Sequence, residues 1–211
     1  YLIMKNNFAY IDNETVNMTK LHIKKAENAT VRNDMHGFTL IEMLVVLIIL
    51  SILVAIAIPS YRQYAVRNAE NEVQAKMLQL EIELERWRAK SLTYQGFQPR
   101  IINSSNNTVT YGYADSPATN KTIYVPDGSD ASNYRYKITL VDGDTPANSL
   151  VNTAVNATGR TWKMIAEPED SGITTYASRM MMNSAGLRCK NTSKNTFDET
   201  NADCDTGQEE W

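Results

Sequence analysis

The chain contains one long apolar stretch, residues 43–58, whose only polar member is Ser51. Counted from Leu40 to Ile58, the stretch holds 19 residues with a single charge, that of Glu42. An α-helix needs about 20 mainly apolar residues to cross the hydrocarbon core of a bilayer, which is about 30 Å thick. The pattern therefore predicts a membrane-spanning helix that begins near Leu40.

A second, amphipathic pattern follows Pro59. Its apolar positions recur every three or four residues, which is typical of one face of a helix, and they are Val66, Ala69, Val73, Met77, Leu80, Leu84 and Trp87. The charged residues of this stretch mostly fall elsewhere, and we expect them to form a solvated or subunit-facing surface. Residues 38–90 thus read as one helix of about 53 residues, or about 80 Å at 1.5 Å per residue, with a bend at Pro59.

After Ser91 the composition shifts to Ser, Thr, Asn, Tyr and Gly, and the pattern becomes that of strands. Residues 91–132 read as a connecting loop, with strand-like pieces at 108–113 and 121–125 and a small hairpin of their own. Stronger strand candidates follow, and the first two alternate apolar with polar residues, as in an antiparallel sheet with one face on a helix; they are residues 134–141, 161–167 and 174–183. The predicted class is α+β, a long N-terminal helix packed on an antiparallel sheet. Residues 145–160 fit either a strand or a loop.

Three consecutive methionines, Met180, Met181 and Met182, fall in the last of these strands. We interpret them as strand residues near the apolar face of the helix, with at least one exposed.

The catalytic signatures that a sequence can carry are missing from this chain. It has no glycine-rich phosphate loop, no nucleophile elbow and no HExxH motif, so we expect no enzymatic activity and no cofactor. The formal net charge is −3, which argues against nucleic-acid binding, because such proteins normally show a basic footprint.

Glu42 requires an explanation. A carboxylate at the centre of a membrane helix costs about 2.5–3.5 kcal/mol, and no Lys or Arg lies between Phe38 and Tyr61. If the chain were cut after Gly37, a new ammonium group on Phe38 would lie four residues from the acid, and on a neighbouring copy it could meet Glu42. The alternative is a solvated acid at the membrane edge.

The run Gly37-Phe38-Thr39-Leu40-Ile41-Glu42, together with Pro59, resembles the signature of type IV pilins and of the pseudopilins of type II secretion, over roughly residues 37–90. In that family a membrane-embedded aspartyl peptidase, the prepilin peptidase, cleaves after the glycine and methylates the new terminal Phe. The resemblance therefore implies cleavage between Gly37 and Phe38 and N-methylation of Phe38. It also implies that Glu42 pairs subunits, that Pro59 is where the helix loosens inside the filament, and that the fold is the pilin roll.

The resemblance also implies an organisation and a location. Residues 1–37 would be a leader that is removed, 38–59 the transmembrane and filament-core helix, 60–90 the amphipathic helix of the head, 91–132 the connecting loop, and 133–211 the sheet with a disulfide-bounded C-terminal loop. The start is open, since Tyr1 is no initiator and Met18 would begin a 20-residue leader with a positive excess. The precursor would cross the bacterial inner membrane once, with its head in the periplasm, and reach the cell surface in a pilus. Its partners would be other pilin subunits in a homo- or hetero-oligomeric filament, the prepilin peptidase, the inner-membrane assembly platform and the membrane.

Loss of the leader would remove both histidines, His22 and His36, and with them histidine catalysis and histidine metal ligation. It would leave 16 basic and 20 acidic residues, because the leader holds five of the 21 and four of the 24. Cys189 and Cys204 match no zinc motif. In an exported domain we expect a disulfide between them, with two free thiols as the alternative.

The C-terminal stretch that contains both cysteines and ends at Trp211 resembles the disulfide-bounded loop of PilE-like minor pilins. The acids crowded in this loop could attract Ca²⁺, but we interpret them as solvated and expect no metal; they are Asp198, Glu199, Asp203 and Asp205.

The function expected from these features is that of a structural subunit, of the minor-pilin kind, in a type IV pilus that serves twitching motility, adhesion or DNA uptake. One alternative is a pseudopilin of a type II secretion system, which shares the N-terminal signature. Another is a membrane-anchored receptor that acts alone, and a basic group near the C-terminus would be its binding patch: Arg179, Arg188, Lys190 and Lys194.

Overall fold

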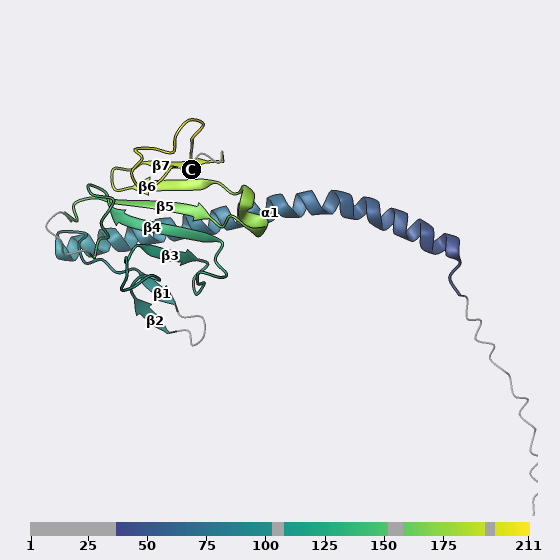
Figure 1. Ribbon diagram of the computed structural model, residues 1–211, viewed down its shortest axis with the longest axis horizontal. Coiled ribbons are helices and arrows are strands. Elements are labelled where there is room, and N and C mark those ends of the chain that lie inside the picture. The colour runs from purple at the N-terminus through teal and green to yellow at the C-terminus, as the bar shows by residue number, and fades with distance from the viewer. Residues whose placement is uncertain (1–36, 103–107, 152–157, 193–196) are drawn as a thin grey trace, which may run out of the picture. The chain divides into compact units, whose positions relative to one another are not determined.

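The computed structural model of the protein describes residues 37–102, 108–151, 158–192 and 197–211. Most of the expected leader, both histidines and Lys194 lie outside these ranges. The chain divides into two compact units, residues 1–44 and 45–211. Its elements (Figure 1) are α1 (Leu40–Ser91), β1 (Arg100–Ile102), β2 (Val109–Tyr111), β3 (Thr122–Val125), β4 (Tyr136–Asp142), β5 (Trp162–Pro168), the 3-10 helix η1 (Gly172–Tyr176), β6 (Arg179–Asn183), β7 (Arg188–Asn191) and β8 (Glu209–Glu210).

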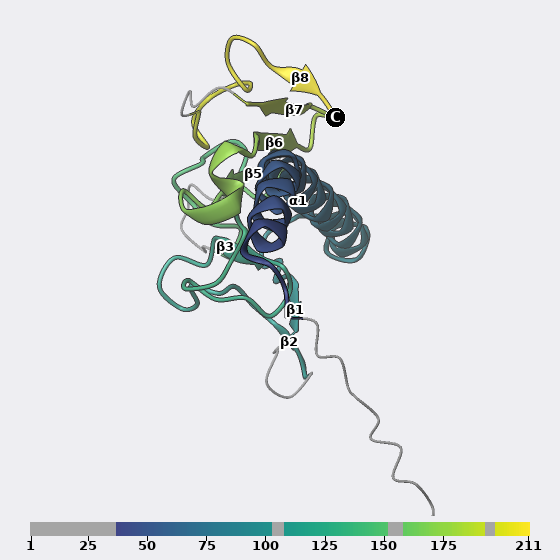
Figure 2. The ribbon, with the colours of Figure 1, turned by 90° about the vertical axis from the view of Figure 1, so that its right-hand side faces the viewer.

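The second unit is built on a six-stranded sheet in the order β3-β4-β5-β6-β7-β8, in which every neighbouring pair is antiparallel. Figures 1 and 2 show this sheet lying against one side of the second half of α1. In the register, Leu140 faces Met164 and Met164 faces Met182. This row of apolar side chains belongs to the core that the helix covers. The expected α+β class is confirmed.

The helix covers the sheet with the apolar face that its sequence pattern predicts. Ala69, Val73, Met77, Leu80 and Leu84 are buried in the main core cluster, and Val66 and Trp87 pack against its edge. All seven expected positions therefore contribute, and the 3-4 spacing of the pattern is confirmed as the contact face.

The charged residues of α1 differ from the expectation of a solvated surface. Lys76 is buried, and its Nζ lies 2.6 Å from Asp127 Oδ1. The Glu81 carboxylate accepts a bond from the Arg188 guanidinium at 2.9 Å. These ion pairs join the helix to strands and loops on either side, so the expectation is wrong for this part of the helix. The pattern alone could not reveal them because each partner lies more than 50 residues away.

A further contact of this kind fastens the helix to the segment before β6. Glu70 Oε1 accepts bonds from the backbone N–H of Ser178 at 2.8 Å and from its hydroxyl at 2.7 Å. The Tyr136 hydroxyl donates to the Ser178 carbonyl at 2.9 Å. Burial raises the pKa of Tyr136, and the nearby Glu70 charge raises it further, so the phenol stays neutral and serves as a donor at this joint.

The sheet begins earlier than the sequence suggested. Residues 121–125 were expected to belong to the connecting loop, but β3 pairs with β4, with Ile123 opposite Ile138. The loop does contain a small hairpin, as expected. It is formed by β1 and β2, which pair with each other as a separate two-stranded sheet. Strand pieces of three or four residues carry too little pattern to specify their partners.

The strand expected over residues 174–183 is shorter than its pattern suggested. Its first part forms η1, and β6 begins only at Arg179. The β-branched pair Thr174 and Thr175 favoured a strand, but Gly172 has a φ of +76° and turns the chain before them. The Thr174 hydroxyl then donates to the Glu169 carbonyl and stabilises the turn.

The face of the sheet away from the helix is also covered, because the C-terminal segment folds back over it. Ile165, Met181, Cys189, Phe197 and Cys204 form a second apolar cluster there. Met180 and Met182 point into the main core instead, so all three methionines are buried. The expectation that at least one is exposed is wrong, because it assumed that this side of the strand faces solvent.

Gly159 joins three segments at a point where a side chain does not fit. Its φ is +56°, and an added Cβ would lie 2.7 Å from the backbone nitrogen of Gln95. Its carbonyl accepts the N–H of Tyr94 at 2.8 Å, and its own N–H donates to Asp142 Oδ2 at 2.8 Å. The segment that follows α1 is thereby tied to the sheet.

We expect Gly159→Ala to lower the free energy of unfolding by about 3 kcal/mol. A left-handed conformation costs a non-glycine residue about 1–2 kcal/mol, and the clash with backbone adds to this cost. Gly186→Ala is the matched control, because Gly186 has a φ of +91° with open space around it, so it should lose only the conformational share, about 1–2 kcal/mol. Denaturant unfolding of the full chain in detergent measures both. Equal losses in the two variants would contradict the crowded junction.

Candidate functional site

The three described residues before α1 are open to solvent. Gly37, Phe38 and Thr39 have no regular structure, and the Phe38 side chain is 71% exposed. A Cβ added to Gly37 would meet nothing within 4 Å. The fold therefore does not need a glycine here, and the bond between Gly37 and Phe38 is accessible to another protein.

Thr39 and Glu42 form the N-terminal cap of α1. The Thr39 hydroxyl oxygen accepts the backbone N–H of Glu42 at 3.3 Å, and the Thr39 carbonyl accepts that of Met43 at 3.2 Å. This is the spacing of a capping box, in which Ser or Thr precedes Glu by three residues. This role of Thr39 was not predicted from the sequence, although the motif T-x-x-E before an apolar run is the known signature of a capping box.

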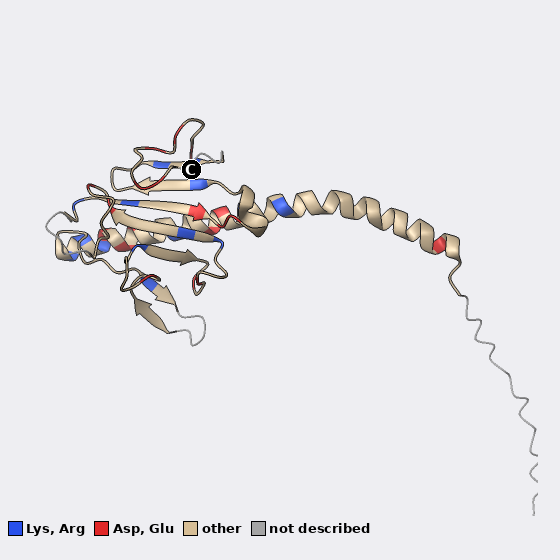
Figure 3. Ribbon diagram, viewed as in Figure 1, with Lys and Arg blue, Asp and Glu red and all other residues tan. Residues whose placement is uncertain are grey.

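The cap does not by itself account for Glu42. An acid in the first turn gains about 0.3–1 kcal/mol from the helix dipole. That gain is smaller than the cost of about 2.5–3.5 kcal/mol for a carboxylate in the middle of hydrocarbon. If this turn of the helix leaves water, the Glu42 carboxylate needs a further partner. The apolar half of α1 offers none, because Figure 3 shows no Lys or Arg in it.

In the part of the chain that the structure describes, nothing covers the apolar half of α1, residues 40–58. Every residue in it is exposed, and the exposed fraction of its large apolar side chains runs from 43% for Val46 to 84% for Leu40. By length and composition α1 is able to cross a membrane. Burying one large aliphatic side chain is worth about 1.5–3 kcal/mol, so the whole half represents tens of kcal/mol, more than the total stability of a typical domain. A bilayer or other apolar helices must surround it.

Pro59 ends the apolar half without ending the helix. The helix continues through it to Ser91. Because proline has no N–H, the carbonyl of Ala55 lacks its helical hydrogen-bond partner in the backbone. The loosening of the helix at Pro59 inside a filament stays a prediction.

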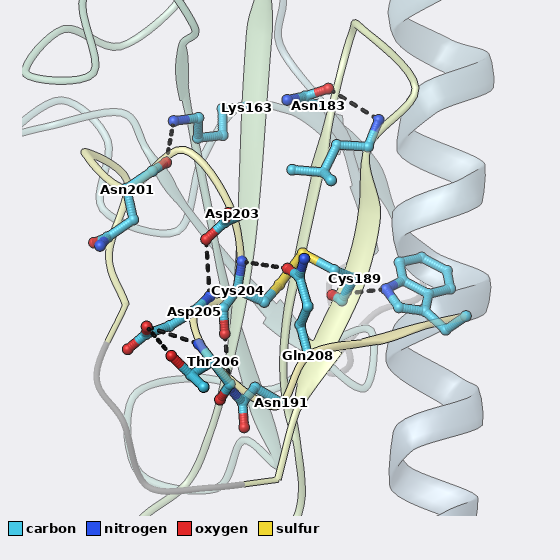
Figure 4. Close-up of a disulfide and its surroundings, with 12 residues drawn as sticks. Lys163, Asn183, Cys189, Asn191, Asn201, Asp203, Cys204, Asp205, Thr206 and Gln208 are labelled. Atoms are coloured by element: carbon cyan, nitrogen blue, oxygen red, sulfur yellow. Dashed lines mark hydrogen bonds between the residues drawn. A yellow bond between two sulfur atoms is a disulfide. The ribbon is translucent and has the colours of Figure 1, made fainter.

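Cys189 and Cys204 are joined in a disulfide that fastens the C-terminal segment to β7 (Figure 4). The Asn191 amide donates to the carbonyls of Cys204 at 2.7 Å and Thr206 at 3.1 Å. The buried Lys163 ammonium donates to the carbonyls of Glu199 at 3.0 Å and Asn201 at 2.8 Å. Disulfide, amide and ammonium together hold this segment against the outer face of the sheet.

The acids of this segment accept hydrogen bonds from neighbouring residues of their own loops. The Asp198 carboxylate accepts the Thr200 hydroxyl and its backbone N–H, and these bonds lower the pKa of Asp198, the hydroxyl first. Asp203 accepts the N–H of Asp205, and Asp205 that of Thr206. Over the described ranges, His, Cys, Asp and Glu form no group of three that could hold a metal ion.

The basic residues of the expected binding patch are paired with acids. Arg179 lies 2.7 Å from Glu167, Arg188 2.9 Å from Glu81 and Lys190 3.5 Å from Glu209. Lys194 lies outside the described residues. Three of the four residues of the patch are therefore already paired with an acid, and these three offer little uncompensated positive charge.

One comparison with known proteins bears on the family. The model of the prokaryotic N-terminal methylation motif matches residues 32–58, which include the open bond after Gly37, the capped helix start and the apolar half. This match over the N-terminal part of the chain supports a protein of the type IV pilin family. No curated protein and no solved structure matched it.

For a pilin-family protein, the motif indicates a structural subunit of a pilin-like or pseudopilin assembly rather than an enzyme. It indicates assembly with other pilin subunits, processing by a prepilin peptidase and a membrane-anchored precursor. Of the residues expected to act, Gly37, Phe38 and Glu42 lie together around the start of α1, whereas Pro59 lies 17 residues beyond Glu42.

Replacing both cysteines with alanine should lower the free energy of unfolding of this pilin-family protein by about 3 kcal/mol, because the bridge closes a loop of 15 residues. Denaturant unfolding in detergent measures the loss. Wild-type protein treated with reductant should lose a similar amount, and the double alanine variant should not respond to reductant. A stability independent of reductant in the wild type would contradict this account.

Proposed function

We propose that this chain is a minor pilin, a low-abundance structural subunit that helps to start a type IV pilus. The observation that supports this most is the complete exposure of the apolar half of α1 next to the methylation motif. The precursor sits in the bacterial inner membrane with its head in the periplasm. After cleavage at Gly37 and methylation of Phe38, α1 moves from lipid into a bundle of similar helices at the core of the fibre.

Glu42 has a specific task in that bundle. Cleavage creates an ammonium group on Phe38, four residues before an acid that lacks a cation in its own apolar half. In the bundle the Phe38 ammonium of one subunit meets Glu42 of its neighbour, and each compensates the other's charge away from water. This pairing sets the axial position of one subunit against the next.

The disulfide favours a pilin over a pseudopilin, because a bridge-bounded C-terminal loop is typical of pilins and is often lacking in pseudopilin heads. Deleting the gene and comparing three processes tests the proposal. Loss of twitching and DNA uptake with normal protein export supports a pilus subunit, whereas loss of export alone indicates a pseudopilin. DNA uptake that depends on the chain in cells without any fibre would indicate a separate receptor.

Gly37→Val should block maturation. A Cβ at Gly37 meets nothing in the fold, so the precursor should still fold and insert, and any defect reports the needs of the peptidase. The expected result is an uncleaved precursor on an immunoblot, while Met35→Val, a matched change two residues away, is processed. Normal processing of Gly37→Val would place the cut elsewhere.

Glu42→Val should leave membrane insertion intact and strongly reduce the amount of the chain in sheared surface fibres. The change makes α1 more apolar but removes the partner of the Phe38 ammonium. Ser51→Val is the matched control, since it also replaces a polar side chain within the apolar half by valine. Immunoblots of membrane and fibre fractions give both quantities. Incorporation of Glu42→Val at the control level would contradict the pairing.

A further inference from the structure

Four large apolar side chains are exposed where α1 enters the head, and we call them the basal surface. They are Tyr61 and Tyr64 on α1 and Ile173 and Tyr176 on η1. Tyr61, Tyr64 and Ile173 line one cleft of about 430 Å³. η1 therefore lies beside the first turns of α1 that follow Pro59, and two distant segments present apolar groups together.

The position of η1 along the helix axis is fixed by buried contacts. Ala69 and Val73 lie in the next two turns of α1 and are buried against the sheet. Ser178, two residues after η1, is bonded to Glu70 through both its N–H and its hydroxyl. Because α1 runs without a break through Pro59, the distance of the basal surface from the apolar half is set by the helix itself.

That distance places Tyr61 within the layer of the lipid headgroups and Tyr64 at its outer edge. At 1.5 Å per residue, Tyr61 lies about 4.5 Å and Tyr64 about 9 Å beyond Ile58, the last apolar residue of the span. The headgroup region is about 5–7 Å thick on each side of the hydrocarbon core. Tyrosine is enriched at this level because its ring is apolar and its hydroxyl is polar.

The charges around the cleft carry both signs. Arg135, Glu169, Asn68 and Asn133 line it, and Arg62 lies between Tyr61 and Tyr64 in the same turn of α1. Phospholipid headgroups such as phosphatidylcholine and phosphatidylethanolamine likewise carry a phosphate and an ammonium group. A surface with both signs fits this zwitterionic layer better than a uniformly anionic one.

We propose that the basal surface rests in the zwitterionic headgroup layer of the bilayer while the chain is anchored as a precursor. The inference builds on the membrane anchorage that the proposed function requires, and the basal surface directly continues the apolar half. Entry into a fibre must then break this headgroup contact as well as withdraw the helix from lipid. The orientation of the waiting head is fixed, with the C-terminal end of α1 farthest from the membrane.

A fluorescent label at the basal surface tests the proposal. Ile173→Cys and the matched Ile82→Cys are each labelled with an environment-sensitive dye in the otherwise intact chain. Both positions are about half exposed, at 46% and 51%, but Ile82 lies 24 residues beyond Ile58, or about 36 Å along the helix. The labelled chains are reconstituted into phosphatidylcholine vesicles, with and without a lipid that carries a nitroxide on its headgroup.

The label at Ile173 should be quenched several-fold more strongly by the nitroxide lipid than the label at Ile82, and it should be shielded from iodide. Tyr61→Ser with Tyr64→Ser should weaken both effects at Ile173 while the chain still floats with the vesicles. Exchanging half of the lipid for phosphatidylglycerol should change neither.

Other outcomes overturn the proposal. Equal quenching of both labels by iodide, in chains that still float with the vesicles, removes the headgroup contact and leaves the proposed function standing. Shielding from iodide without quenching by the nitroxide lipid would assign the basal surface to another protein subunit. A requirement for phosphatidylglycerol would exclude the zwitterionic match. If the chains fail to float with the vesicles, the chain is not anchored in the membrane, and both proposals are wrong.

Discussion

The apolar half of α1 is the constraint on which the rest of this protein depends. Its side chains are exposed to a degree that water does not tolerate, so the chain is incomplete without a bilayer or other apolar helices. The single acid, Glu42, makes these two environments unequal. The hydrocarbon core of the bilayer offers Glu42 no cation, whereas a neighbouring trimmed subunit carries one at its new terminus. This difference gives the proposed transfer from membrane to fibre a direction.

The head is built so that it follows the helix rigidly. The apolar face of α1 packs on the sheet, and partly buried polar contacts on either side fix its position: Glu70 with Ser178, Lys76 with Asp127, and Glu81 with Arg188. A buried pair that loses one partner leaves an uncompensated charge, which costs about 3–5 kcal/mol, so Lys76 in particular resists sliding. Whatever positions the second half of α1 therefore also positions the basal surface and the disulfide-bounded segment.

The sequence was sufficient wherever a feature extends over many residues. The apolar half, the seven-position contact face of α1 and the α+β class follow from long periodic patterns. Failures came where a few residues depend on distant partners. Lys76 is buried because Asp127 reaches it, the three methionines because the C-terminal segment covers β6, and β3 joins the sheet because β4 accepts it. At the candidate site the motif residues were recognisable, and the cap between Thr39 and Glu42 was not predicted although its T-x-x-E spacing stands in the sequence.

The central claim is that the start of α1 is made by cleavage and carries the charge that Glu42 meets. Mass spectrometry of the N-terminal peptide of this chain, taken from the fibre fraction, tests it most directly. We expect a peptide that begins at Phe38 and is one methyl group heavier than its sequence. A peptide that retains Gly37 and the residues before it, or that begins at another position, would contradict the account.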